Sequence, residues 1–466
     1  MCCGRGSPAP GGAFVVIFLL IYIAVLFLLA WITARRAPDK ETYFVNGRRS
    51  SANVVALSIV ASCVGGSATM GMAGLAWQVG TPAIWWLLSG AAGLVLLSLF
   101  LARKVRRSGA ITMPEMLTTF LGAPSRPLAS VIIVTAWLAI LAAQFSALAT
   151  IIAPLAGIDK NVAMLVGAAV LVGHTLAGGQ ASVMKTDIWQ FGILLLSLLT
   201  ALLLTLHLGG GEAITAVQVE VLNEQFPASK LRYFLCILGG SYVVCPMLFG
   251  RMLSARDEHA ARKGGLMAAV GLTFTAALIV ILGISCRDLV PAGTPPEQVL
   301  TTALLSHLPA WAATLILLGI FSAIFSAADS CLITAASVCS NDILRKPGVK
   351  ICRICLIFLG LMGLVLALPG RGILALLLMA NDIYVCGVVP PVFIGMLLHG
   401  KVQFRPWGMA VAILGGGLMG LTAALTGNSD WSFAGLAFSL FMSLVAARRS
   451  PQSVEKEAEV QAGHGI

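Results

Sequence analysis

Charged residues are scarce in this chain. Asp, Glu, Lys and Arg together make up 11% of the 466 residues, whereas an average soluble domain has roughly 25%. Apolar residues make up 58% of the chain, and the mean hydropathy is +0.95. So little polar surface cannot cover a soluble fold of this composition, and so apolar a chain does not stay disordered. The composition excludes both classes and predicts a membrane protein.

Acidic residues are fewer than basic ones, and the formal net charge is +11. The basic residues do not form a patch with interleaved aromatic residues, as a nucleic-acid surface would. They lie in short clusters between apolar runs, which is the distribution that membrane topology produces. The expected partners are therefore the lipid bilayer and small molecules, and not nucleic acid.

The chain also lacks the usual signs of catalysis and of ATP use. It has no GxxxxGK[ST] phosphate loop, so nothing indicates ATP-driven transport. Cys352 and Cys355 form a CxxC without a second pair, which does not indicate a metal centre. The few histidines and acids are scattered. We therefore expect no enzymatic activity and no organic cofactor.

Thirteen apolar segments follow one another along the chain. A membrane-spanning helix needs about 20 mostly apolar residues, and each segment approaches or exceeds that length. They cover residues 13–34, 52–78, 81–102, 127–152, 161–178, 183–207, 231–250, 262–286, 311–341, 352–368, 373–398, 407–426 and 431–447.

The basic residues set the expected orientation. With thirteen spans, 24 of the 30 Lys and Arg residues fall on one side, including a cluster of Arg251, Arg256, Arg262 and Lys263. The positive-inside rule then places the N-terminus outside and the C-terminus in the cytoplasm. The polar tail 450–466 is predicted to be disordered.

Two of the segments carry a glycine pair near the middle. Gly65-Gly66 lies in the second segment and Gly239-Gly240 in the seventh. Interrupted helices at corresponding positions of two halves are typical of transporters with an inverted repeat. The alternative is that the glycines only allow close helix packing.

Ionisable residues at membrane depth are costly and usually functional. Asp329 lies on one predicted helix face with Ser322, Ser326, Ser330, Thr334 and Ser337. Such an oxygen-lined stripe is a candidate cation path, although hydroxyls can also bond back to their own helix. Asp187 follows Lys185, and a local ion pair is the simple alternative to a functional role. His174 and His207 are expected to be interfacial.

Five stretches in order resemble one family, the sodium/solute symporters that include sugar, proline, pantothenate and sialic acid carriers. Within the third stretch, Thr186, Asp187 and Gln190 match the family's Thr-Asp-x-x-Gln signature. The stretches are YFVNGRRSSANVVALSIVASCVGG (43–66), ITMPEMLTTFLG (111–122), AGGQASVMKTDIWQF (177–191), CPMLFGRMLSARD (245–257) and IFSAIFSAADSCLITAASVCSNDIL (320–344).

The resemblance implies an all-α polytopic fold of the LeuT type, with about thirteen spans. Two inverted five-helix repeats would occupy residues 51–208 and 209–399. Residues 1–50 would hold an extracellular N-terminus, a peripheral helix and a basic cytoplasmic loop. Residues 400–449 would add two peripheral helices, before the cytoplasmic tail 450–466.

The resemblance also implies a sodium site. Its ligands would be the backbone carbonyls of Ala61 and Val64, the carbonyl of Ala323 and the hydroxyl of Ser326. Position 327 is Ala, where the family usually has Ser or Thr, so one oxygen ligand is missing. Asp187 aligns with an acid near this site. A second cation position, known in some members, would use Asp329 and Ser330.

The solute would bind near the membrane midplane, along the unwound parts of two core helices. The expected lining has no basic residue, which disfavours a bare anion. Tyr242 could equally be an ordinary packing residue. The nominated residues are Gly66, Ser67, Thr69, Gln144, Ser241, Tyr242, Asn381 and Asp382.

The sequence therefore predicts a plasma-membrane carrier, in a bacterial inner membrane, that imports a small polar organic solute with sodium by alternating access. Two alternatives remain open at this point. The carrier could be coupled to protons through Asp329 or Asp187, or it could be a solute sensor without transport. The solute, the stoichiometry and the oligomeric state are not determined.

Overall fold

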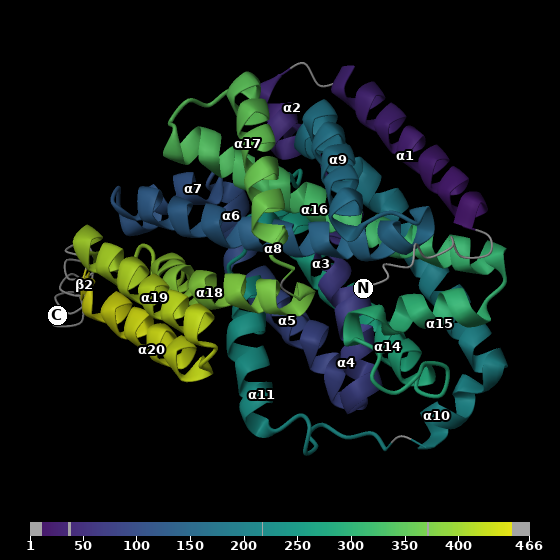
Figure 1. Ribbon diagram of the computed structural model, residues 1–466. Helices are drawn as coiled ribbons and strands as arrows, with labels where there is room; N and C mark the ends of the chain where they lie inside the picture. The colour runs from purple at the N-terminus through teal and green to yellow at the C-terminus, as the bar shows by residue number, and fades with distance from the viewer. Residues whose placement is uncertain (1–11, 36–38, 217, 371, 450–466) are drawn as a thin grey trace, which may run out of the picture.

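The computed structural model describes residues 12–35, 39–216, 218–370 and 372–449. These residues are almost entirely helical (Figure 1). The helices are α1 (Gly12–Arg35), α2 (Lys40–Val45), α3 (Ala52–Cys63), α4 (Met72–Val79), α5 (Trp85–Leu96), α6 (Ala102–Arg107), α7 (Met113–Leu121), α8 (Ser125–Ala156), α9 (Lys160–Thr205), α10 (Gly211–Ala216), α11 (Ala228–Tyr233), α12 (Gly239–Val243), α13 (Pro246–Leu253), α14 (Glu258–Ser285), α15 (Val299–His307), α16 (Ala310–Val338), α17 (Val349–Ala367), α18 (Ile373–Leu397), α19 (Pro406–Thr426) and α20 (Ser429–Val445).

Short 3₁₀ and π segments join several of these helices. The π segments Leu97–Leu101, Leu206–Gly210 and Phe234–Leu238 each connect two helices directly, and Ser67–Gly71 and Cys339–Ile343 each extend one helix. Two short strands, β1 (Val402–Phe404) and β2 (Ala447–Arg449), pair in an antiparallel ribbon. The predicted tail 450–466 and the first eleven residues lie outside the described part of the chain.

The predicted apolar segments coincide with helices, with one difference in how they are divided. Among the described residues, ten helices are long and apolar enough to cross a membrane, or eleven with the bent pair α3–α4. The segments 161–178 and 183–207 run into each other as α9, which bends at Gly179 (φ 60°, ψ −166°). The 17-residue α20 is a shorter apolar helix. The total of thirteen spans stays a prediction.

The first predicted break is confirmed. Helix α3 ends at Cys63, and the two halves of the span, 52–63 and 67–79, meet at an angle of 65°. Val64 has non-helical angles (φ −98°, ψ 73°), and Gly65 and Gly66 follow it. A helix that stops in the middle of a span leaves backbone carbonyls free for other partners.

The second predicted break was misplaced. Gly239 and Gly240 lie inside α12, and the chain becomes extended five residues later, at Val244 and Cys245. The cause is Pro246, because a proline disfavours helical angles in the preceding residue and has no N–H to donate.

Gly239 serves close packing instead. A Cβ atom built on it would lie 2.9 Å from the Ser89 carbonyl oxygen of α5, and one built on Gly93 of α5 would lie 2.1 Å from the Gly239 carbonyl oxygen. The packing alternative therefore holds for this glycine pair.

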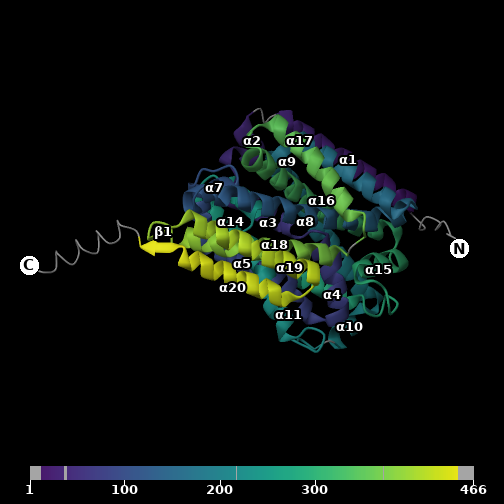
Figure 2. The ribbon, with the colours of Figure 1, turned by 60° about the vertical axis from the view of Figure 1, so that its left-hand side comes forward.

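Helix α16 forms the centre of the molecule, and α1 lies at its edge. The best 18-residue window of the α16 span is 94% buried, whereas that of α1 is 17% buried. Figures 1 and 2 both show α1 on one side of the molecule and α19 with α20 on the opposite side. The central α16 packs against α8 and α9. Polar side chains of α16 therefore face other helices and not the surroundings.

Candidate functional site

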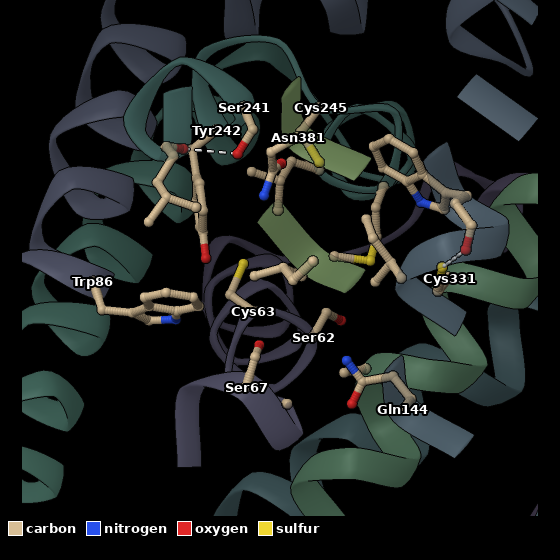
Figure 3. Close-up of a pocket in the computed structure, with 18 residues that line it drawn as sticks. Ser62, Cys63, Ser67, Trp86, Gln144, Ser241, Tyr242, Cys245, Cys331 and Asn381 are labelled. Atoms are coloured by element: carbon tan, nitrogen blue, oxygen red, sulfur yellow. Dashed lines mark hydrogen bonds between the residues drawn. The ribbon is translucent and has the colours of Figure 1, made fainter. Parts of the chain in front are cut away.

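A cavity lies beside the two helix breaks. Figure 3 shows Trp86, Tyr242 and Cys63 on one side of it and Gln144 and Cys331 on the other. The lining residues are Ser62, Cys63, Gly65, Ser67, Trp86, Trp137, Ile140, Gln144, Leu238, Ser241, Tyr242, Cys245, Met247, Leu248, Ala327, Cys331, Leu377 and Asn381.

The lining contains no Asp, Glu, Lys, Arg or His side chain. Three aromatic rings and several aliphatic and thiol groups provide apolar contact area, while hydroxyl and amide groups provide hydrogen bonds. Such a mixture is typical of small-molecule sites, where a few polar groups fix the ligand's orientation. The cavity can hold an uncharged or zwitterionic solute without an ion pair from a lining side chain.

Most of the residues nominated for the solute site lie together at this cavity. Ser67, Gln144, Ser241, Tyr242 and Asn381 line it directly. The break itself is held by one of them, because the Gly66 N–H donates a hydrogen bond to Gln144 Oε1 at 3.0 Å.

Two nominated residues lie elsewhere. The Thr69 hydroxyl is buried and donates to the Gly65 carbonyl oxygen at 3.0 Å. Asp382 accepts hydrogen bonds from Tyr233 (2.8 Å) and Ser432 (2.7 Å). It lines a second cavity, formed mainly by α11, α18 and α19.

The sequence analysis missed Trp86 and Trp137, which line the central cavity. A tryptophan inside an apolar span gives no sign in the sequence of whether it faces lipid, a neighbouring helix or a cavity. Cys63 and Cys245, which were not nominated for the solute site, also line the cavity, one at each break.

A buried polar cluster lies next to the cavity and is centred on Asp187 of α9. Its Oδ1 accepts a hydrogen bond from the Ser326 hydroxyl of α16 at 2.5 Å. Its Oδ2 accepts a hydrogen bond from the Ser58 hydroxyl of α3. Asp187, Ser58 and Ser326 all have 0% of their surface exposed. The carboxylate therefore ties together three core helices.

The cation of this cluster is Arg251 of α13, which the sequence analysis had counted with a basic loop cluster. The side chain is fully buried, and Nη2 lies 3.4 Å from Asp187 Oδ2. Asp187 is thus paired with Arg251 and not with the exposed Lys185. The sequence did contain a sign of this burial. Arg251 lies only five residues after Pro246, which places it within the broken span and not in the loop that follows.

Asp329 faces a different neighbour. Its Oδ2 lies 2.7 Å from His174 Nδ1 of α9, and the Thr175 hydroxyl donates to its Oδ1. His174 has 1% of its surface exposed, so the expectation of an interfacial histidine was wrong.

The predicted oxygen-lined stripe of α16 therefore does not line a single cation path. Ser326 and Ser330 face the Asp187 cluster, Asp329 faces His174, and the Ser322 hydroxyl donates to Tyr22 of α1 at 2.7 Å.

The predicted sodium ligands come from the break in α3 and from the facing part of α16. Ala327 lies against this break: a Cβ atom built on Gly65 would be 2.7 Å from the Ala327 Cβ atom. Carbonyl and hydroxyl oxygens are suitable ligands for a hard cation. Ala327 presents a methyl group where the family usually offers another hydroxyl.

Comparison with known proteins agrees with this architecture. The family model for the sodium:solute symporter family matches residues 43–398. The high-affinity choline transporter 1 of Caenorhabditis elegans is 24% identical, over 86% of this chain and 77% of its own length. The sodium/pantothenate symporter of Haemophilus influenzae is 24% identical, over 71% of this chain and 72% of its own.

Among solved structures, the outward-open state of a Na⁺-coupled sialic acid symporter superimposes with a TM-score of 0.78 at 17% identity. The match covers 96% of this chain and all of that one. The fold is that of the LeuT-type transporters, as the sequence predicted. Because the family model matches well over half of its residues, the chain belongs to the sodium:solute symporter family.

Proposed function

We propose that this chain imports a small polar organic solute through the central cavity, with sodium bound at the break in α3. As a member of the sodium:solute symporter family, it is a multi-pass membrane protein and a secondary transporter that couples a small solute to sodium. It is a transporter and not an enzyme. The proposal concerns which residues bind the solute and which bind the sodium ion.

The observation that carries the proposal is that both substrates would share one segment of backbone. Ser62, Cys63 and Gly65 line the solute cavity, and the carbonyls of Ala61 and Val64 lie between and beside them. Because Val64 to Gly66 connect two halves of a broken helix, a cation held there fixes the geometry of the cavity wall. Binding one substrate thereby favours the conformation that binds the other.

The sodium ligands that we propose are the carbonyls of Ala61, Val64 and Ala323 and the hydroxyl of Ser326. The solute ligands that we propose are Ser67, Gln144, Ser241, Tyr242 and Asn381, with Trp86 and Trp137 as apolar walls. The lining favours a neutral or zwitterionic solute, since it has no cationic side chain for a bare anion.

The finer assignments of membrane and domain also belong to this proposal. Residues 51–208 and 209–399 would form the two inverted repeats, and rocking of one bundle against the rest would expose the cavity alternately to each side. The distribution of basic residues supports an extracellular N-terminus and a cytoplasmic C-terminus. A bacterial inner membrane is the location that we propose. The proton-coupled carrier and the transport-inactive sensor are not favoured by the family assignment.

The test is sodium-dependent thermal stability of the detergent-purified protein, followed by uptake into proteoliposomes. A ligand that binds only the folded state raises the melting temperature. We expect a saturable rise with sodium chloride over N-methyl-D-glucamine chloride at equal ionic strength. Choline is avoided as the reference cation because several relatives are choline transporters. No saturable rise at any pH between 5.5 and 8 would refute sodium binding.

A solute screen in proteoliposomes would follow under an inward sodium gradient. We expect at least one neutral or zwitterionic solute whose uptake stops when the sodium gradient is removed. Uptake that is unchanged without sodium and follows a proton gradient would instead overturn the sodium assignment.

A further inference from the structure

Arg251 is the largest side chain that the fold buries completely among the described residues. It lies on α13, directly after the break at Val244 and Cys245. Its guanidinium reaches across to α3, α9 and α16. Nη2 donates to Ser62 Oγ at 2.6 Å and to Ser330 Oγ, and Nε donates to Ser58 Oγ at 3.2 Å. Nη1 donates to the Met247 carbonyl oxygen at 3.1 Å.

These contacts use the oxygens that a second cation would need. Ser330 contacts Arg251 and is 3.0 Å from Ser62 Oγ. Asp187 Oδ2 is shared by Ser58 and Arg251, and Oδ1 accepts from Ser326. Asp329, the acid nominated for that position together with Ser330, is turned toward His174. A metal ion there would have to displace donors that already satisfy these oxygens.

Charge balance leads to the same conclusion. The carboxylate of Asp187 and the guanidinium of Arg251 compensate each other inside the fold, where both are fully buried. A sodium ion bound to Asp187 and Ser330 would lie next to a fixed positive group and leave the cluster with an uncompensated charge. Buried charges are tolerated only when they are paired and hydrogen-bonded.

We propose that Arg251 is the resident cation of the second cation position, so that this chain binds a single sodium ion, at the break in α3. This inference rests on the proposed sodium coupling and makes it specific. Asp187 then acts as a positioning residue for sodium and not as its ligand. Because Asp187 accepts the hydrogen bond from the Ser326 hydroxyl, the lone pairs of Ser326 Oγ stay free for the ion in the first position.

The experiment counts saturable ²²Na⁺ sites on the purified full-length protein, with sodium as the only ligand. We expect one site per protein in the wild type. We expect two sites in Arg251→Gln, which keeps hydrogen-bonding capacity but removes the charge, and one site in the matched control Arg251→Lys. Size-exclusion profiles and melting curves verify that each variant is folded.

The outcomes separate this inference from the proposed function. No saturable site in the wild type would refute sodium coupling itself. Two sites in the wild type would leave sodium coupling intact and overturn the role of Arg251. A folded Arg251→Gln protein that still binds one ion would also overturn it, because its charge would not be what excludes the second ion. If Arg251→Gln does not fold, one sodium site in both the wild type and Arg251→Lys supports a single sodium ion. Two sites in either protein overturn the inference.

Discussion

The hydroxyl of Ser326 is the most informative single group to remove. It donates a 2.5 Å hydrogen bond to Asp187 Oδ1, and it is the one side-chain ligand that we assign to sodium. Both residues have no exposed surface. Ser326→Ala therefore removes one ion ligand and one donor to a buried carboxylate, while deleting only a single oxygen atom.

The size of the effect follows from hydrogen bonds to charged groups, which contribute about 1.5–3 kcal/mol each. If the lost sodium contact is of similar strength, the apparent sodium affinity falls about 10- to 150-fold, since 1.4 kcal/mol corresponds to a factor of ten. The free energy of unfolding without sodium should also fall, by about 1–3 kcal/mol, because Asp187 Oδ1 loses its donor.

The assay is a sodium titration of the melting temperature, or of ²²Na⁺ binding, with two control variants. Ser326→Thr keeps the hydroxyl and should retain most of the affinity. Ser322→Ala removes a buried hydroxyl one turn away that donates to Tyr22, and its sodium affinity should stay at the wild-type value. A Ser326→Ala protein that binds sodium as tightly as the wild type would refute our sodium site. Equal losses in both alanine variants would show a general packing effect.

Three further predictions test the packing, the break and a helix cap. Gly93→Ala should destabilise the protein by about 1–3 kcal/mol, because its Cβ would overpack against the Gly239 carbonyl oxygen of α12. The control Gly192→Ala, whose Cβ would meet no atom within 4 Å, should be neutral or slightly stabilising. Equal melting temperatures of the two variants would contradict the close contact at Gly93. Gln144→Leu should cost about 1–3 kcal/mol because the buried Gly66 N–H loses its acceptor, and an unchanged thermal midpoint would mean that another group accepts that bond. Asp257 accepts the Ala260 N–H at the start of α14, which lowers the pKa of its carboxyl. The ionised Asp257 carboxylate therefore stabilises the fold above the pKa that it has in the unfolded chain, and this stabilisation is lost as the pH falls. Asp257→Asn should flatten the acid side of the stability–pH profile. An unaltered acid side would argue against this cap.

The sequence by itself determined the membrane class, the positions of the helices and the first break. These depend on local properties: a run of apolar residues long enough to span a bilayer, and glycines that disrupt a helix at a particular place. The resemblance of five ordered stretches indicated the family and correctly predicted that most of the cavity residues lie together. The second break was misplaced by five residues, because the glycine pair marks close packing, while the extended turn is set by Pro246.

Only the tertiary structure decided which partner each polar group faces. The regularly spaced polar side chains of α16 were predicted to form one cation path. Instead, Ser326 and Ser330 face the Asp187 cluster, Ser322 faces Tyr22 and Asp329 faces His174, since other helices surround α16 on all sides. From the sequence, Arg251 was predicted to be one of a cluster of cytoplasmic charges, and His174 was predicted to be an interfacial residue. Their burial becomes visible only when helices distant in sequence supply Asp187 and Asp329, because a charge is stable inside the fold only where packing brings a compensating group within contact.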